Sequence, residues 1–406
     1  MNSPIEKPLQ VEQKTNMHYW LLFIGIIFIG TNLRAPLTSV GALIPEIRDD
    51  FGISNALAGS ITTLPLLAFA LLSPFAPRIA NRFGMEVTMA GALLLLFLGI
   101  VIRSLAGLSF LFTGTLFVGL AIAMGNVLIP GLVKLNFPLR TGIMTGLYAV
   151  SMNIFGALGS GLSVPISSLG NVGWRGSLAV WGLMTVLALL VWIPQLRKPR
   201  EARPAKKASG RKTKSLWRSS LAWQITIFMG LQSLFFYTTI TWLPDILQVH
   251  GYSSSEAGWV VFFMQVALIP VTFIMPVAAE KVKNQVGLSV GTAVLFLIGF
   301  LGLLQGGVWT PLYAALIGMG CGSGFSLAMM FFTLRSNDGY EAAQMSGMAQ
   351  SFGYLLAAIG PVAVGAFQDI SGSWTVPLLL LTAIAVLFLL AGIGAGKDRV
   401  IQRESL

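Results

Sequence analysis

Long apolar runs constrain the fold of this chain more than any other feature. A helix needs about 20 consecutive, mostly apolar residues to cross a bilayer, and runs of that length recur from one end of the chain to the other. Only 10% of the residues are charged, against about 25% in a soluble domain. We therefore predict an all-α membrane protein with twelve transmembrane helices, at residues 17–44, 56–77, 85–107, 109–133, 141–167, 175–195, 219–246, 256–278, 286–305, 309–334, 342–368 and 374–395.

A basic segment, residues 196–218, divides these runs into two sets of six. Ten Lys and Arg residues lie in this segment, and the other connections are short. The two sets share features at a nearly constant spacing: Gly119 and Gly318 are 199 residues apart, and Trp174 and Trp374 are 200 apart. Such spacing predicts two parallel six-helix repeats. We divide the chain into a tail (1–16), an N-terminal bundle (17–195), the basic linker (196–218), a C-terminal bundle (219–395) and a second tail (396–406).

The basic residues predict the orientation of the chain in the membrane. With the N-terminus inside, 22 of the 26 Lys and Arg residues fall in inner segments, three (Arg48, Arg103 and Arg175) fall in outer segments, and Arg34 lies within a span. Cytoplasmic segments carry such an excess, so both termini and the linker are expected in the cytoplasm, with the chain in the cytoplasmic membrane. The charge of the linker suits anionic lipid headgroups. Nucleic acid is the alternative, and we expect the lipid bilayer as the partner, not nucleic acid.

Arg34 lies about two-thirds of the way along the first apolar run. An unpaired charge in hydrocarbon costs roughly 2.5–3.5 kcal/mol or more, so Arg34 is expected to face the protein interior or a water-filled cavity and to mark a site. The alternative is an arginine that only joins helices through their carbonyl groups. Pro36 lacks a backbone N–H and is expected to break the helix locally. At the 199-residue spacing, the equivalent position in the second half is Ser233.

The acidic residues narrow the chemistry of a site at Arg34. All fifteen Asp and Glu residues lie in predicted loops or within a turn or two of a span end. Cation pumps and proton antiporters usually need a carboxylate at membrane depth, and a guanidinium does not release its proton. As the only charge at that depth, Arg34 is expected to bind a ligand as its counter-charge: a carboxylate, a small anion or an electron-rich nitro group. Protons stay open as a coupling partner.

Other polar side chains also lie well inside the predicted spans. A buried amide or phenol needs a hydrogen-bond partner in a membrane, so these side chains are expected to face the interior of the bundle. There each of them either contacts a ligand or joins two helices, and both interpretations stay open. The candidate substrate-binding residues are Arg34, Asn32, Asn126, Tyr148, Asn153, Gln232, Tyr237, Gln265, Gln350 and Tyr354.

The segment between the second and third spans resembles a loop signature of the major facilitator superfamily. It reads Ala76-Pro77-Arg78-Ile79-Ala80-Asn81-Arg82-Phe83-Gly84. Arg82 and Gly84 match the signature, and Asn81 stands where the family usually has Asp. The resemblance implies a gate on the cytoplasmic side that works through charge contacts with helix ends. The candidate gating residues are Arg78, Asn81, Arg82 and Gly84, together with Pro36.

Longer stretches resemble one branch of that superfamily, the cyanate and 2-nitroimidazole transporter family. The matching stretches are 32–41 in the first span, 126–138 at the end of the fourth, 231–244 in the seventh and 345–354 in the eleventh. The resemblance covers both halves of the chain. It implies a single-chain secondary transporter for a small-molecule substrate, working as a monomer, with its binding site between the halves near the middle of the membrane.

Other functional classes find little support in the residues. The chain has one cysteine, Cys321, and two histidines, without the spacing of a metal site. It has no recognisable catalytic set, phosphate-binding loop or soluble domain, so we expect no cofactor and no enzyme activity. Three hypotheses remain: a secondary transporter of small anionic or polar solutes, a multidrug exporter of the same fold, and a non-transporting membrane sensor.

Overall fold

The computed structural model describes residues 11–53, 55–196 and 216–401, so most of the predicted linker and parts of both predicted tails lie outside the described residues. Nearly all of the described backbone is helical. The helices are α1 (Val11–Asn32), α2 (Ala35–Phe51), α3 (Asn55–Leu72), α4 (Ala76–Phe83), α5 (Met85–Arg103), α6 (Leu108–Asn136), α7 (Thr141–Ser167), α8 (Gly173–Leu196), the short 3-10 helix η1 (Leu216–Arg218), α9 (Ser220–Val249), α10 (Ser254–Lys281), α11 (Val286–Gln305), α12 (Thr310–Leu334), α13 (Gly339–Ser371) and α14 (Thr375–Gly396).

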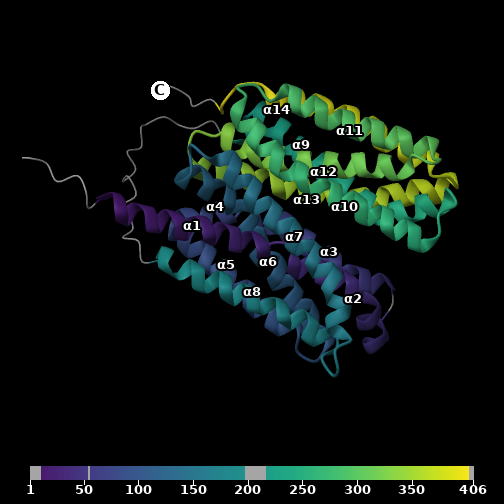
Figure 1. The fold of residues 1–406 in the computed structure, drawn as a ribbon, viewed down its shortest axis with the longest axis horizontal. Coiled ribbons are helices and arrows are strands. Elements are labelled where there is room, and N and C mark those ends of the chain that lie inside the picture. Colours follow the sequence, from purple (N-terminus) through teal and green to yellow (C-terminus); the bar gives the residue numbers. More distant parts are fainter. Residues whose placement is uncertain (1–10, 54, 197–215, 402–406) are drawn as a thin grey trace, which may run out of the picture.

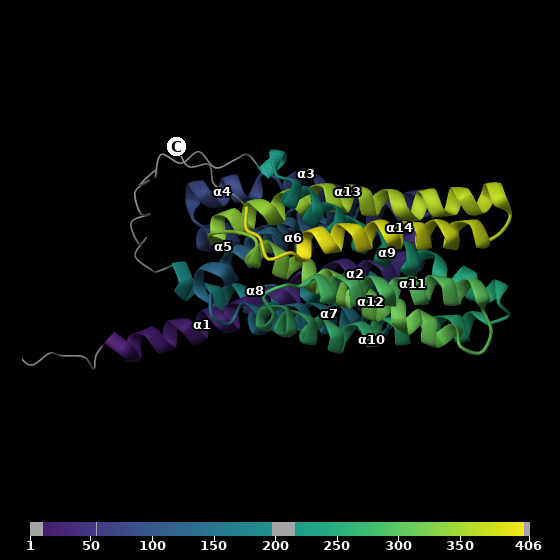
Figure 2. The same ribbon diagram turned by 90° about the horizontal axis from the view of Figure 1, so that it is seen from above.

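The helices have the lengths that a membrane protein requires. In the described ranges, 11 helices are long and apolar enough to cross a membrane, and a bent pair raises the number to as many as 12. The pair joins Ser60–Leu72 to Ala76–Phe83 at an angle of 57°. Helices α1–α8 make up one bundle and α9–α14 the other (Figures 1 and 2). This confirms the predicted all-α architecture of two six-span bundles.

Two stretches differ from the prediction. The first span, predicted as one run over 17–44, is two helices that break between Asn32 and Ala35. The segment predicted as a loop after the second span is the helix α4. Pro77 lies in its first turn, where a missing N–H costs no helical hydrogen bond. Gly84 ends α4 with a φ of 93°, which glycine adopts without the strain that other residues would suffer.

In each bundle two helices approach closely at a glycine, and the two glycines are 200 residues apart in the sequence. A Cβ atom on Gly99 of α5 would lie 2.8 Å from the backbone N of Val118 in α6. A Cβ atom on Gly299 of α11 would overlap the side chain of Ile317 in α12. Glycine is therefore required at equivalent helix crossings in the two bundles, as expected if the bundles are repeats of one unit.

The two bundles are held together at one end of the molecule. We call this the terminal end. It contains the turn between α4 and α5 and the last residues of α8 and α14, and it lies at the left in Figure 1. There, Lys134 of α6 donates through Nζ to the Thr333 carbonyl at 2.8 Å, and Thr141 of α7 donates to Glu280 of α10 at 3.0 Å. A Cβ atom on Gly142 would lie 2.5 Å from the Pro276 carbonyl oxygen. One buried apolar cluster runs through both bundles behind these contacts.

At the opposite end, which we call the distal end, the bundles separate. The face of α7 that packs against α10 is buried near the terminal end, at Gly142 and Gly146, and is exposed farther along, at Ala157 and Gly161. A Cβ atom on Gly161 would meet no described atom within 4 Å. The two bundles in Figure 1 diverge toward this end. The described structure is therefore closed at the terminal end and spread at the distal end.

Candidate functional site

The first span breaks beside Arg34, as the presence of Pro36 predicts. Helix α1 ends at Asn32 and α2 begins at Ala35, and Arg34 between them has the non-helical φ and ψ of −131° and −40°. Pro36 has no N–H to donate to the preceding turn, which removes one bond of the helical ladder. The break places Arg34 in the interior of the molecule, on the N-terminal bundle and facing the C-terminal one.

The Arg34 side chain is held from both bundles. Its Nη1 donates to Oδ1 of Asn153 in α7. Its guanidinium carbon lies 4.7 Å from the centre of the Phe236 ring in α9, a cation–π contact with the other bundle. The aliphatic part of the side chain crosses Gly156, where a Cβ atom would lie 2.9 Å from the Cδ of Arg34. Gly156 therefore provides the space in which Arg34 lies.

One edge of the Arg34 guanidinium remains free. Among the described residues, Nε and Nη2 have no hydrogen-bond partner. The residue is half-buried, and neither atom is among the enclosed polar atoms that lack a partner. An exposed Nε–Nη2 edge presents two parallel N–H groups, the geometry that binds a carboxylate or a similar planar anion. Arg34 can thus bind an acceptor group without giving up its present contacts.

A second buried arginine was missed in the sequence. We assigned Arg103 to an outer segment, but the structure buries it completely, with Nη1 2.6 Å from the Pro36 carbonyl oxygen. Its Nε and Nη2 are enclosed and unpaired within the described part of the chain. The expectation that Arg34 is the only charge inside the bundle is therefore wrong. The signal was present, because Arg103 falls inside the predicted span 85–107.

The described carboxylates lie near helix ends and do not compensate these charges. Glu46 accepts from Ser167 at 2.7 Å, and Asp50 pairs with Arg175 at 2.8 Å, both near the distal end. Glu280 is part of the contact between the bundles at the terminal end. Described His, Cys, Asp and Glu side chains form no group of three or more that could hold a metal ion. The chemistry of the central region is cationic and aromatic.

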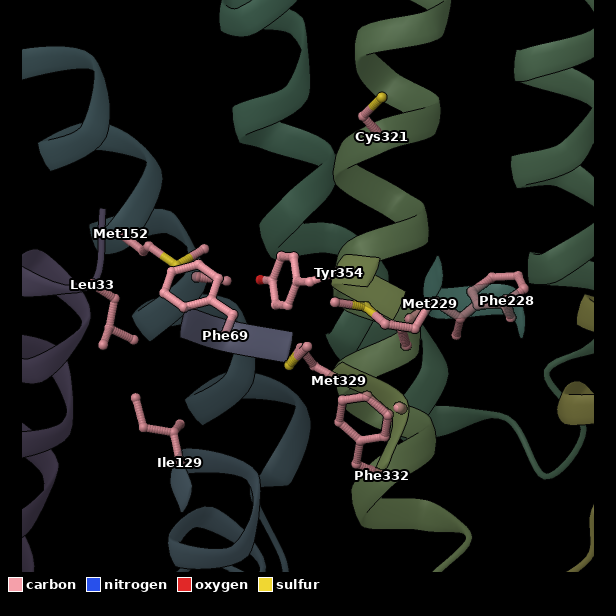
Figure 3. Packing of buried hydrophobic residues seen from close by; sticks show 14 of the residues in the cluster. Leu33, Phe69, Ile129, Met152, Phe228, Met229, Cys321, Met329, Phe332 and Tyr354 are labelled. Atoms are coloured by element: carbon pink, nitrogen blue, oxygen red, sulfur yellow. The ribbon is translucent and has the colours of Figure 1, made fainter. Parts of the chain in front are cut away.

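Aromatic side chains from both bundles meet next to Arg34. The ring of Phe69 in α3 lies 4.9 Å from that of Tyr354 in α13, and Tyr354 lies 6.5 Å from Tyr237 in α9. Figure 3 shows Tyr354 with its hydroxyl directed toward Phe69 and the N-terminal bundle. Arg34 and Tyr148 are both within electrostatic range of that hydroxyl. Five of the predicted site residues are thus brought together between the bundles, namely Arg34, Tyr148, Asn153, Tyr237 and Tyr354.

Other predicted site residues make contacts within the scaffold. Asn32 joins α1 to α8, because its Oδ1 accepts from Thr185 at 2.7 Å and its Nδ2 donates to the Met184 carbonyl at 3.3 Å. Gln232 donates to its neighbour Ser233 at 2.8 Å inside the C-terminal bundle. Both side chains are buried; the amide oxygen and nitrogen of Asn32 both have partners, while the Nε2 of Gln232 donates to groups of its own helix. For Asn32 the structure favours the interpretation of a contact between helices, and for Gln232 both interpretations stay open.

Three other predicted amides have polar atoms without a described partner. Gln350 of α13 donates to the Asn126 carbonyl of α6 at 3.0 Å and so joins the two bundles, while its Oε1 is enclosed without a partner. The side chains of Asn126 and Gln265 are half-buried, and no described residue forms a hydrogen bond with either of them. These two amides are therefore open to a ligand or to water.

Four of the five predicted gating residues lie on or beside α4 at the terminal end, and the fifth, Pro36, lies in the first turn of α2 beside Arg34. Arg78 and Arg82 are exposed, with their guanidinium groups over the rings of Phe75 at 5.6 Å and Phe83 at 5.3 Å. Asn81 is half-buried. A Cβ atom on Gly347 of α13 would lie 2.6 Å from the carbonyl oxygen of Ser73, just before α4. Helix α4 thus follows a point of close contact between the bundles, and the gating role of these residues stays a prediction.

Comparison with known proteins gives the family. The sequence profile described as Major Facilitator Superfamily matches residues 22–361. The chain belongs to the Major Facilitator Superfamily. Over 94% of its length it is 48% identical to the uncharacterized transporter YycB of Bacillus subtilis, matching 95% of that protein. It is 41% identical to the 2-nitroimidazole transporter of Escherichia coli, covering 94% of this chain and 97% of that one.

Further matches agree with this membership. The cyanate transport protein CynX of Escherichia coli is 26% identical over 87% of this chain and 91% of that protein. The predicted resemblance to the cyanate and 2-nitroimidazole branch is therefore confirmed. The solved structure of the proton:xylose symporter XylE bound to 6-bromo-6-deoxy-D-glucose superposes with a TM-score of 0.77, covering 95% of this chain and 98% of that one. At 13% identity, the match to this superfamily transporter concerns the fold alone.

Proposed function

We propose that this superfamily transporter moves a small anionic or electron-rich solute across the cytoplasmic membrane, with Arg34 as its central substrate-binding charge. The observation that carries the proposal is the free Nε–Nη2 edge of Arg34, at a helix break between two aromatic-lined bundles. A site with the half-buried guanidinium of Arg34, the buried one of Arg103 and no described carboxylate beside them repels cations and attracts anions. The relatives named for 2-nitroimidazole and cyanate transport fit this chemistry.

The arrangement of the bundles supports transport by alternating access. We place the terminal end in the cytoplasm, because the excess of Lys and Arg lies in segments at that end. The described structure then corresponds to an outward-facing state, closed below Arg34 by the contacts of Lys134 and Thr141. Rocking of one bundle against the other would open the terminal end and close the distal one. One chain supplies both walls of the site, so a monomer is sufficient.

Ligand-induced thermal stabilisation of the purified transporter tests this proposal. A ligand that binds the folded protein raises its melting temperature by mass action, so nitrite, 4-hydroxybenzoate and 2-nitroimidazole are screened as probes. At least one is expected to stabilise the wild type and not Arg34→Gln. Arg48→Gln is the matched control, because Arg48 is a partly exposed arginine at the distal end of α2. Stabilisation of Arg34→Gln equal to that of the wild type would contradict the proposal.

A flux measurement distinguishes transport from sensing. Proteoliposomes that contain the wild type are expected to accumulate the stabilising probe, and those with Arg34→Gln are not. Repeating the assay with and without a pH gradient shows whether protons are coupled to the movement. Binding without any flux would favour the sensor hypothesis, and stabilisation by organic cations alone would favour the multidrug hypothesis.

A further inference from the structure

Asn153 binds the guanidinium of Arg34 through its neutral side-chain amide. It is 7% exposed, and its Nδ2 donates to the Ala149 carbonyl at 2.9 Å, while its Oδ1 accepts from Arg34. A carbonyl can only accept and a guanidinium can only donate, so a single orientation of the amide satisfies both contacts. The amide oxygen is therefore fixed toward Arg34.

The remaining described neighbours of the guanidinium are also uncharged. Phe236 covers one face of the group, and Gly156 lies under the side chain. The hydroxyl of Thr38 lies within hydrogen-bond distance of the Arg34 carbonyl oxygen and donates to the Gly156 carbonyl oxygen at 2.7 Å. Glu46, the described carboxylate nearest in sequence, is about 18 Å away along α2 at 1.5 Å per residue. Its side chain is engaged by Ser167.

The net charge of the site depends on whether residue 153 carries a neutral amide or a carboxylate. Aspartate has almost the same shape as asparagine and would accept the same hydrogen bond from Arg34. It would also form a buried ion pair that cancels the positive charge before a ligand arrives. We propose that Asn153 is the charge-selectivity determinant of this transporter, because it orients Arg34 and leaves its positive charge available to the ligand. This inference rests on the proposed function of Arg34.

The same contacts define the shape of the group that binds. Asn153 occupies Nη1 and Phe236 covers a face, so a ligand has access to the Nε–Nη2 edge in the plane of the guanidinium. Two parallel donors in one plane match a planar group with two acceptor oxygens, such as a carboxylate, nitrite or an aromatic nitro group. A linear anion with one terminal acceptor makes one of the two hydrogen bonds. We therefore expect planar two-oxygen acceptors to bind better than linear anions.

Three variants at one position separate charge from structure. Asn153→Asp keeps the shape and the hydrogen bond to Arg34, and is expected to weaken binding of nitrite and 4-hydroxybenzoate about 100-fold, the scale of one lost charge-assisted interaction. Its melting temperature is expected to equal or exceed that of the wild type, since it pairs Arg34. Asn153→Gln keeps a neutral amide and is expected to retain anion binding within about 10-fold. Asn153→Leu removes the acceptor and is expected to lower both affinity and melting temperature.

The outcomes are distinguishable from a failure of the proposed function. If Asn153→Asp binds both anions as the wild type does while Arg34→Gln binds neither, this inference is wrong and the role of Arg34 stands. If Arg34→Gln binds normally, the proposed function itself is wrong. Should Asn153→Asp not fold, Asn153→Gln decides: retained anion binding supports the inference, and a loss as large as that of Asn153→Leu overturns it.

Discussion

Lys134 and Thr333 are 199 residues apart in the sequence and in contact in the structure, with Nζ donating to the carbonyl oxygen at 2.8 Å. The same spacing relates the repeated glycines of the two bundles. Two equivalent positions can touch only where the pseudo-symmetry axis between the repeats passes. The contact therefore lies on the axis at the terminal end, where an ammonium meets the electronegative C-terminus of α12.

We expect Lys134→Met to open the terminal end more often. The substitution removes a charge-assisted hydrogen bond worth roughly 1.5–3 kcal/mol, so the population of inward-open molecules should rise about 10-fold or more. Distances between spin labels on the distal ends of α7 and α10 would measure the change. Lys281→Met is the control, because Lys281 is exposed at the same end. Identical distance distributions for Lys134→Met and the wild type would contradict the prediction.

We expect Gly156→Ala to weaken substrate binding without unfolding the protein. The new Cβ atom would lie 2.9 Å from the Cδ of Arg34, so the arginine must move, and such overpacking costs about 1–3 kcal/mol. Affinity for the stabilising probe should fall about 10-fold. Gly161→Ala, five residues farther along α7, adds a Cβ atom with no described neighbour within 4 Å. Equal losses in the two variants would show that helix propensity, and not Arg34, is responsible.

Arg103→Met is expected to retain the fold and lose substrate affinity. Replacing a buried, incompletely paired charge with an apolar side chain of similar length is often neutral or stabilising, so the melting temperature should not fall. The loss of the bond to the Pro36 carbonyl frees the first turn of α2, two residues from Arg34. Arg103→Lys retains one donor and should bind more tightly than Arg103→Met. A large drop in melting temperature with unchanged affinity would assign Arg103 to folding alone.

Arg335→Met is expected to destabilise the C-terminal bundle. Arg335 is 2% exposed and donates to the carbonyls of Ala395 and Gly396 at 3.1 and 3.0 Å, at the end of α14. Leaving these acceptors unpaired should cost about 2–3 kcal/mol and lower the melting temperature. Arg399→Met is a control, since Arg399 is exposed and its side chain makes one described hydrogen bond, to the Gly394 carbonyl at 3.2 Å. Equal melting temperatures for the two variants would contradict this assignment.

The hardest property to predict was the side of its helix on which a polar residue lies, and therefore the neighbour that it contacts. In most soluble helices an apolar stripe identifies the buried face, but the spans of this chain are apolar all round. Asn32 and Asn153 looked alike in the sequence, yet one contacts Thr185 of α8 and the other Arg34. Arg103 was assigned to an outer segment, while the packing of α5 against α6 buries it and its guanidinium reaches the Pro36 carbonyl of α2.

The number and approximate length of the spans, their arrangement in two repeats, and the position of Arg34 beside a helix-breaking proline could all be predicted from the order of the residues. These follow from local rules: the cost of polar groups in lipid, the length of a helix across a bilayer, and the missing N–H of Pro36. The packed helices were needed to show that Asn153 contacts Arg34, that Phe236 of the other bundle covers it, and that one edge stays free. Those contacts join residues more than a hundred positions apart, and they depend on the rotation and spacing of packed helices, which apolar sequences do not encode locally.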